Sequence, residues 1–153
     1  MGLARHDPIR TQAGLNYPLQ VGLVRIPEGM QSQVMTTPKL PLIGLVGPCA
    51  SGKSTLREGL ERLGYAVRHI AQEHSYVPDM WKCITNPDLL VFLDVSYPVT
   101  CRRSNLNWSE ADFAEQQQRL ADARQHADLL IQTDNLSIQE VLQRVVSFVE
   151  QRK

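Results

Sequence analysis

One stretch of nine residues constrains this 153-residue chain more than any other. The residues are Gly47, Pro48, Cys49, Ala50, Ser51, Gly52, Lys53, Ser54 and Thr55. They fit the pattern G-x-x-x-x-G-K-[ST], with every fixed position filled. An apolar run at 40–46 leads into this stretch, and leucines at helical spacing (Leu56, Leu60, Leu63) follow it. The pattern therefore predicts a buried strand, a glycine-rich turn and a helix in direct succession.

A turn of this kind suits the binding of a polyphosphate. Its glycines let successive backbone N–H groups point inward, and the helix that begins near Lys53 adds the positive end of its dipole. We therefore interpret all nine residues as nucleotide-binding, with Lys53 as a catalytic residue at the β- and γ-phosphates and Ser54 as a ligand of Mg²⁺. The alternative is a glycine-rich turn that matches by chance. The sequence has no guanine-specific Asn-Lys-x-Asp, which favours ATP over GTP.

Composition and charge exclude several classes of protein. The 16 basic residues equal the 16 acidic ones, so no basic excess indicates nucleic acid as the main partner. Cys49, Cys83 and Cys101 are far apart and form no C-x-x-C pair, which favours reduced thiols over a disulfide framework or a zinc site. Cys49 is either an oxidisable thiol or simply a small residue that fits the loop. No apolar run has the length of a membrane span, and the expected location is cytoplasmic.

From residue 40 onward, strand and helix patterns alternate. Strands are expected at 41–46, 65–70, 89–93 and 129–131, and helices at 53–63, 99–103, 109–127 and from 137 onward. The stretch through 82 is irregular or briefly helical. Ser109 with Asp112, and Ser137 with Glu140, have the spacing of capping boxes. The alternation predicts a three-layer α/β fold with a small parallel sheet of about four to five strands.

The first 38 residues differ from the rest of the chain. Prolines interrupt them, glutamine is frequent, and only 19–26 alternates enough to indicate a short strand. We interpret 1–38 as a flexible N-terminal extension and 39–153 as the nucleotide-binding domain. A start at Met35 would place the first strand almost at the N-terminus, so an over-extended start is a second hypothesis.

Three further segments resemble small P-loop kinases. Residues 87–103, with the run from Pro87 to Ser96 and then Arg102 and Arg103, look like the fourth strand and lid of thymidylate kinase. Residues 63–67 resemble the link from the P-loop helix to the second strand in the same enzymes. Residues 127–137 are similar to the last strand and adenine-side loop of shikimate and dephospho-CoA kinases. The resemblance covers most of 40–150 and implies a P-loop NTPase fold of the nucleoside and nucleotide kinase type.

The resemblance assigns roles to several polar residues. Arg103 matches the first lid arginine, which implies a nucleotide-binding and catalytic role near the adenine and phosphates; the alternative is a solvated helix arginine. Asp134 and Asn135 match the loop beside the adenine base, although both residues also form turns. Arg119 and Arg124 are weaker candidates for charge stabilisation, since most helix arginines lie at the surface.

The chain also departs from the kinase pattern. Asp94 ends an apolar run, as a Walker B carboxylate that holds Mg²⁺ does, and as a simple cap at the end of a strand also does. The resemblance places Asp94 on the fourth strand, whereas a Walker B aspartate lies on the strand that follows the acceptor region. Only 23 residues separate Gly64 from Asp88, so a strand and much of the acceptor domain are expected to be missing. The place of a second lid arginine holds Asn107.

Any acceptor site must then fit within residues 71–82. Glu73 could accept the proton of an acceptor hydroxyl or help to hold Mg²⁺, and the alternative is a solvated carboxylate. Tyr76 and Trp81 could stack on a substrate or pack the loop. For His74 the sequence identifies no partner, and Asp79 follows a proline and could shape a turn.

Taken together, the residues predict a P-loop kinase that binds ATP and Mg²⁺ and transfers the γ-phosphoryl group to a small, nucleoside- or nucleotide-like acceptor. The alternative is a regulatory or sensor NTPase without an acceptor, because the phosphate grip is complete while the acceptor region is short. A third hypothesis is an NTPase that acts on a macromolecular partner. Neither nucleic acid nor a membrane is expected as a partner, and the acceptor and the oligomeric state stay open.

Overall fold

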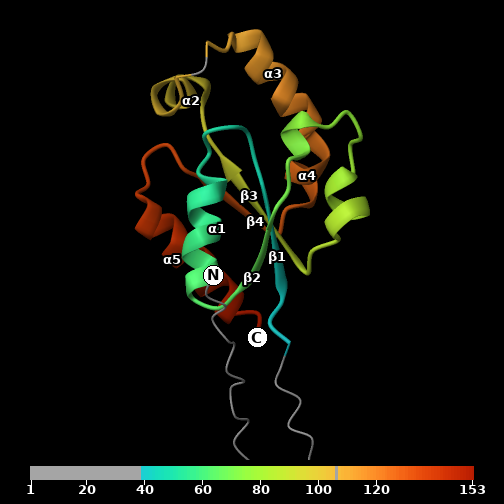
Figure 1. The fold of residues 1–153 in the computed structure, drawn as a ribbon, viewed down its shortest axis with the longest axis vertical. Coiled ribbons are helices and arrows are strands. Elements are labelled where there is room, and N and C mark those ends of the chain that lie inside the picture. The colour runs from blue at the N-terminus through green and yellow to red at the C-terminus, as the bar shows by residue number, and fades with distance from the viewer. Residues whose placement is uncertain (1–38, 106) are drawn as a thin grey trace, which may run out of the picture. The chain divides into compact units, whose positions relative to one another are not determined.

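The computed structural model describes residues 39–105 and 107–153, so the predicted extension at 1–38 lies outside the described residues (Figure 1). The elements are β1 (Leu42–Val46), α1 (Lys53–Arg62), β2 (Ala66–His69), a 3₁₀ turn (Gln72–His74), a π-helical turn (Trp81–Thr85), β3 (Leu89–Asp94), α2 (Tyr97–Arg103), α3 (Glu110–Arg119), α4 (Ala121–His126), β4 (Leu129–Gln132) and α5 (Ile138–Glu150). None of the described helices combines the length and apolar character needed to cross a bilayer.

The four described strands form one parallel sheet in the order β2-β1-β3-β4. In this register, Ile43 on β1 lies opposite Val67 on one side and Leu89 on the other. All carboxyl ends therefore meet at one edge of the sheet, which is where ligands of open parallel sheets bind. In Figure 1 this edge points toward α2 and α3.

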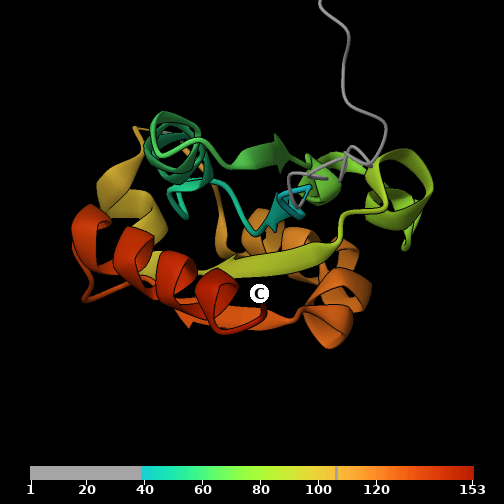
Figure 2. The same cartoon turned by 90° about the horizontal axis from the view of Figure 1, so that it is seen from below.

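Two apolar cores, one on each face of the sheet, give the fold its three layers. The strand residues alternate between the cores, because successive side chains of a strand point to opposite faces. Leu45 and Val91 belong to the core under α1 and α5, whereas Val46 and Phe92 belong to the core under α4 and the π-helical turn. Figure 2 shows these helices on opposite sides of the sheet. The predicted three-layer α/β class is confirmed.

Both predicted capping boxes are present. Ser109 Oγ accepts from the N–H of Asp112, and Ser137 Oγ accepts from that of Glu140, and in each case the acidic side chain accepts from the N–H of the capping serine. The single helix expected over 109–127 is wrong, however, because the chain breaks at Leu120 into α3 and α4. Leu120 is fully buried against the sheet, and the bend lets α4 pack on β3 while α3 continues toward the phosphate loop.

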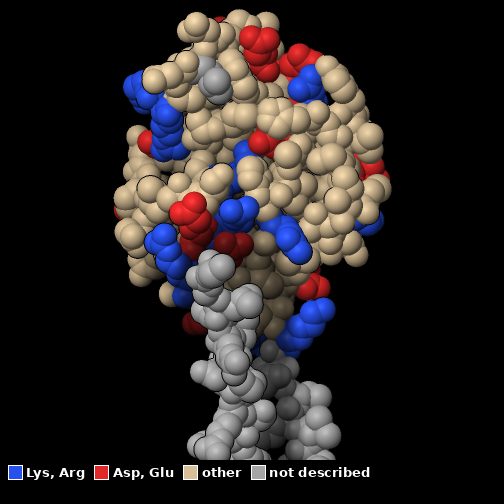
Figure 3. All heavy atoms as spheres, viewed as in Figure 1, with Lys and Arg blue, Asp and Glu red and all other residues tan. Residues whose placement is uncertain are grey.

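Along the described chain, no strand lies between β2 and β3. β2 hydrogen-bonds directly to β1, and the connection from β2 to β3 contains only the 3₁₀ and π-helical turns. The carboxyl end of β2, with the residues that follow it, therefore lies next to that of β1. On the face drawn in Figure 3, acidic and basic side chains are interspersed, in keeping with a formal net charge of zero.

Candidate functional site

The phosphate loop connects the carboxyl end of β1 to the first turn of α1. Gly47 has a φ of +148°, and a Cβ placed on it would lie 2.1 Å from the carbonyl oxygen of Leu93 on β3. No side chain fits in that space, so the loop needs glycine here. Ala50 and Gly52 also have positive φ angles, of 61° and 98°. The loop is thus a tight backbone cradle packed against the end of the neighbouring strand.

Lys53, the first residue of α1, folds back across this cradle. Its Nζ donates to the carbonyl oxygens of Gly47 at 2.5 Å and Pro48 at 2.8 Å. It also pairs with Glu73 Oε1 at 2.8 Å, and the two side chains are only 5% and 3% exposed. The sequence singled out both residues but did not predict this buried ion pair, which depends on the placing of β2 beside β1.

Glu73 lies in the 3₁₀ turn after β2 and is almost fully buried. The alternative of a solvated carboxylate is therefore wrong. Its Oε1 faces Lys53 and, at 4.0 Å, His69 Nε2, while its Oε2 is buried without a hydrogen-bond partner among the described residues. Burial and the charge of Lys53 lower the pKa of His69, against the opposing effect of Glu73. Burial, assisted by Glu73 and opposed by Lys53, raises the pKa of the Cys49 thiol.

Arg103, at the end of α2, reaches the opposite side of the phosphate loop. Its guanidinium donates to Thr133 Oγ1 at 3.0 Å, to the Thr133 carbonyl at 2.7 Å and, more weakly, to the Ala50 carbonyl at 3.4 Å. It lines a cavity of about 520 Å³ together with residues of the phosphate loop, of α1 and of the chain around the start of α5. The lining residues are Ala50, Ser51, Gly52, Thr55, Leu56, Arg103, Thr133, Leu136, Ser137, Ile138 and Val141. The structure therefore brings Arg103 and the loop together, as the resemblance implies.

Asp134 and Asn135 do not line that cavity, although their neighbours Thr133 and Leu136 do. Asp134 Oδ1 instead accepts from the N–H of Ser96 at 2.9 Å, just before α2. Burial by itself would raise the pKa of this carboxyl, but hydrogen bonds from Ser96 and Gln132, together with the charge of Arg103, hold the pKa below its ordinary value. Asp134 thus ties the loop before α5 to the end of β3, and its contact with a base stays a prediction.

Asp94 is engaged within the protein. Its Oδ2 pairs with Arg124 Nη2 at 2.7 Å, and its Oδ1 accepts from the N–H of Val95. The guanidinium of Arg124 also lies over the ring of Phe92, 5.3 Å from its centroid. Of the two interpretations of Asp94, these contacts favour the structural cap over the Mg²⁺ ligand, and they assign Arg124 to the same strand end.

Arg119 connects α3 to the turn that carries Glu73. It donates to the backbone carbonyl of Glu73 at 3.2 Å, to Glu115 at 2.6 Å and to the hydroxyl of Tyr76 at 2.6 Å, and it lies over the Tyr76 ring. Trp81 is buried and donates from Nε1 to Asp122, so it packs the segment down. Of the two roles that the sequence left open for Trp81, stacking on a substrate or packing the loop, this contact favours packing.

A smaller cavity, of about 290 Å³, lies beside the phosphate loop. Its lining residues are His74, Trp108, Asp112, Glu115, Gln116 and Arg119. Gln116 is buried, and its Oε1 accepts from the N–H of Cys49 at 3.1 Å, which fixes α3 against the loop. Sequence reasoning missed Gln116, because a glutamine among other polar helix residues gives no signal of burial.

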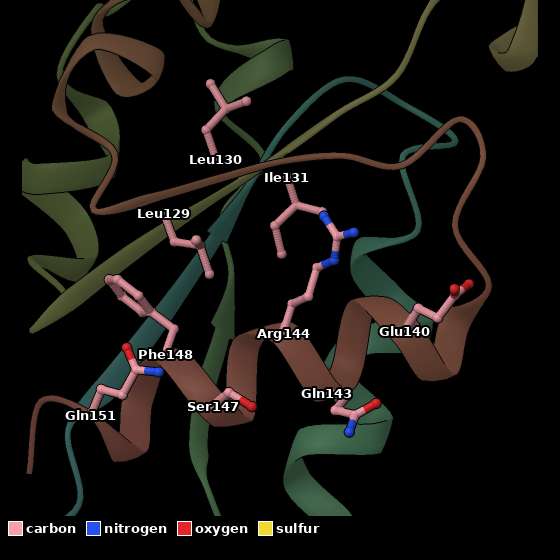
Figure 4. Close-up of a pocket in the computed structure, with 9 residues that line it drawn as sticks. All are labelled: Leu129, Leu130, Ile131, Glu140, Gln143, Arg144, Ser147, Phe148 and Gln151. Atoms are coloured by element: carbon pink, nitrogen blue, oxygen red, sulfur yellow. The ribbon is translucent and has the colours of Figure 1, made fainter.

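A third hollow lies between the edge strand β4 and α5 (Figure 4). Leu129, Ile131 and Phe148 form its apolar floor, and Arg144 and Glu140 stand at its side. No residue of the phosphate loop lines it. We therefore assign the candidate site to the larger cavity, which loop residues line, and to the smaller one, whose Gln116 hydrogen-bonds to the loop.

Comparison with known proteins identifies the fold. Neither the protein-family models nor the curated protein sequences give a match to this chain. Among solved structures, YorR from Bacillus subtilis in complex with phosphorylated GDP aligns with a TM-score of 0.55 and 16% identity, over 72% of this chain and 96% of YorR. Shikimate kinase from Bacteroides thetaiotaomicron aligns with a TM-score of 0.50 and 17% identity, over 71% of this chain and 98% of the kinase. At these identities the likeness shows the fold, and the predicted P-loop kinase-like architecture is confirmed.

Proposed function

We propose that this protein is a P-loop kinase that binds ATP with Mg²⁺ and transfers the γ-phosphoryl group to a small, nucleoside- or nucleotide-like acceptor. The observation that carries the proposal is the position of Lys53, held by Glu73 across a backbone cradle that only glycine at position 47 permits. A buried lysine at the mouth of such a cradle is a ready partner for phosphate oxygens.

The residues present fit a triphosphate. The cradle at Gly47 has no room for a side chain, and Ser51 Oγ is buried in the loop without a hydrogen-bond partner among the described residues. The loop amides and Lys53 would hold the phosphates, and Ser54 would hold Mg²⁺. Arg103 would contact the nucleotide from the larger cavity, which we call the adenine-side cavity. A bound nucleotide would supply the phosphoryl group, and the metal ion held by Ser54 would neutralise the charge that develops on it.

Binding of phosphate requires Lys53 to exchange partners. In this structure its Nζ is shared between Glu73 and two loop carbonyls. When Lys53 turns to a phosphate, the carboxylate of Glu73 is left buried and free to accept a proton or to join the shell of Mg²⁺. We propose the first role, with the acceptor hydroxyl in the cavity beside His74, Gln116 and Arg119.

A second candidate function is supported by the size of that cavity. Ligand pockets for small molecules have volumes of about 300–1,000 Å³, and the acceptor-side cavity, at about 290 Å³, lies at the lower limit of that range. The adenine-side cavity, at about 520 Å³, lies well inside the range. A nucleotide-binding regulatory or sensor NTPase, which needs only the larger cavity, is therefore the alternative.

The remaining proposals concern the cellular location, the domain bounds and the choice of nucleotide and acceptor. We infer a cytoplasmic protein in which residues 39–153 are the nucleotide-binding domain and 1–38 are an extension of it. YorR was solved with a guanine nucleotide, so GTP is to be tested beside ATP. The formal net charge of zero, and the interspersed charges on the face drawn in Figure 3, support a small-molecule acceptor over nucleic acid.

The test is transfer of label from γ-labelled ATP or GTP, with Mg²⁺, to a panel of nucleosides, nucleotides and small metabolites. We expect label on one class of acceptor, and a loss of roughly 10²–10³-fold in Lys53→Ala, the cost of removing one charge-stabilising donor. Lys153→Ala removes an exposed lysine at the end of the chain, whose ammonium pairs with Glu150 and lies over the ring of Tyr65, and it should transfer at the wild-type rate. Nucleotide binding without transfer would favour the sensor, and the absence of any nucleotide binding would overturn both functions.

A further inference from the structure

Three side chains that can ligate a metal meet beside the phosphate loop. Cys49 comes from the loop itself, and Glu73 and His74 come from the turn after β2. One ligand atom from each of the three lies within 4.8 Å of the other two. Cys49 is half-buried, Glu73 is buried and His74 is exposed, so the cluster is open to solvent on one side.

The distance between Cys49 and His74 suits a shared metal ion as well as a weak hydrogen bond. Cys49 Sγ and His74 Nε2 are 3.8 Å apart. Zn–S and Zn–N bonds of about 2.3 and 2.0–2.1 Å at a tetrahedral angle separate the two ligand atoms by about 3.6 Å. The pair therefore has almost the separation that a shared zinc ion imposes.

Glu73 supplies an independent observation. Its Oε1 belongs to the ion pair with Lys53, but its Oε2 is buried without a hydrogen-bond partner among the described residues. A buried carboxylate oxygen without a partner is costly, and coordination of a cation removes that cost. The carboxylate can bridge Lys53 and a metal ion, one oxygen to each.

We propose that Cys49, Glu73 and His74 form a Zn²⁺ site next to the phosphate loop. The thiolate, imidazole and carboxylate are the ligand set that zinc prefers, and three protein ligands leave the fourth tetrahedral position for water. Binding releases the thiol proton to solvent, and the new bonds are Zn–S, Zn–N and Zn–O. A bound zinc ion ties the turn after β2 to the phosphate loop and occupies the Glu73 carboxylate, so Glu73 acts as the base proposed above only in the zinc-free form.

This site is distinct from that of the Mg²⁺ proposed with ATP. Magnesium takes oxygen ligands and keeps several waters, so it has no use for a thiolate or an imidazole. The spacing of cysteines along the sequence argued against zinc, because no C-x-x-C pair exists. The structure assembles its ligands from two segments that are distant in sequence and adjacent only because β2 lies next to β1.

The test measures Zn²⁺ binding to the full chain without nucleotide, by competition with a chromophoric chelator under reducing conditions. We expect one tight site, weakened at least about tenfold in Cys49→Ser and in His74→Gln, since even the loss of an outer-shell partner costs 10–100-fold. The matched controls Cys83→Ser and His126→Gln alter an exposed cysteine and an exposed histidine outside the cluster, and they should bind as the wild type does.

Co²⁺ gives a second readout that reports the ligands directly. In the wild-type protein we expect the absorption bands of four-coordinate Co²⁺ with a thiolate-to-metal charge-transfer band, and the loss of that band in Cys49→Ser. Circular dichroism verifies that each variant is folded. Zinc affinity that is unchanged in both cluster variants, or a cobalt spectrum without a thiolate band, overturns the proposal. Both readouts are obtained without nucleotide, so they stand apart from the outcome of the transfer assay.

Discussion

The buried pair between Lys53 and Glu73 offers the sharpest test of the site, because its energy can be worked out from the structure. Its two charged atoms lie 2.8 Å apart, and both side chains are at most 5% exposed. At an effective dielectric constant of about 20, Coulomb's law gives a gross attraction of about 6 kcal/mol at this distance. Desolvation of the two charges offsets most of that attraction, so the large effect appears when one partner alone is removed.

Lys53→Met keeps the apolar stem but leaves a buried carboxylate without its cation. We expect a loss of about 3–5 kcal/mol in the free energy of unfolding, or roughly 10–20 °C in Tm for a domain of this size. Glu73→Gln should cost only about 1–2 kcal/mol, because Lys53 keeps the carbonyls of Gly47 and Pro48 and the glutamine still accepts a hydrogen bond. The double variant should be about 2 kcal/mol more stable than the sum of the single losses predicts.

The assay is urea unfolding without nucleotide, followed by circular dichroism and extrapolated linearly to zero denaturant. The matched control is the pair of Glu58 and Arg62 on α1, whose charged atoms are 3.7 Å apart and whose side chains are 57% and 79% exposed. Its coupling energy should stay below about 0.5 kcal/mol. A coupling between Lys53 and Glu73 no larger than the control's would refute the reasoning, since the pair would then be solvated or unformed.

Three further predictions concern the loop and its surroundings. Gly47→Ala should lower the free energy of unfolding by about 2–4 kcal/mol, because the cost of a strained backbone is added to that of a clash with the Leu93 carbonyl. The control Gly64→Ala, also at positive φ but in open space, should lower it by only about 1–2 kcal/mol. Equal losses in the two variants would contradict the clash. Burial lowers the pKa of His69 in the folded protein. As the pH falls below the ordinary value of 6.5, the histidine is protonated in the unfolded chain before it is protonated in the folded one, so the free energy of unfolding should decline below this pH. Urea unfolding at several pH values should show a smaller decline for His69→Gln. Arg103→Ala should raise the Kd of ATP roughly tenfold by calorimetry, and an unchanged Kd would remove Arg103 from the nucleotide site.

The fold was accessible from the sequence because its signals are local. β1 and β3 are short apolar runs, each capping box is visible in the spacing of two residues, and the motif fixes the junction of β1 and α1. The break at Leu120 was not accessible, because polar residues on both sides continue a helical pattern. It arises from tertiary packing, in which Leu120 is buried against the sheet.

Only part of the site could be predicted from the sequence, because contacts between side chains depend on the order of the strands. Lys53, Glu73 and Arg103 were singled out by motif, composition and resemblance, but their partners depend on which strands are neighbours. Asp94 illustrates this limit, since a strand-end aspartate can hold a metal ion or an arginine. Here Arg124, which is 30 residues further along the chain, reaches it from α4.

The order of the strands accounts for the remaining features of the site together. In a parallel sheet, the residues that follow the strand next to β1 lie beside the phosphate loop. The short connection between β2 and β3 leaves that place to β2 itself, so the first acidic residue after β2, Glu73, meets Lys53. The same short connection places His74 next to Cys49, and it contains few residues that could form an acceptor cavity. The direct pairing of β2 with β1 thus produces the buried ion pair, the candidate zinc ligands and the small acceptor cavity, and an insertion that moved β2 away from β1 would remove all three.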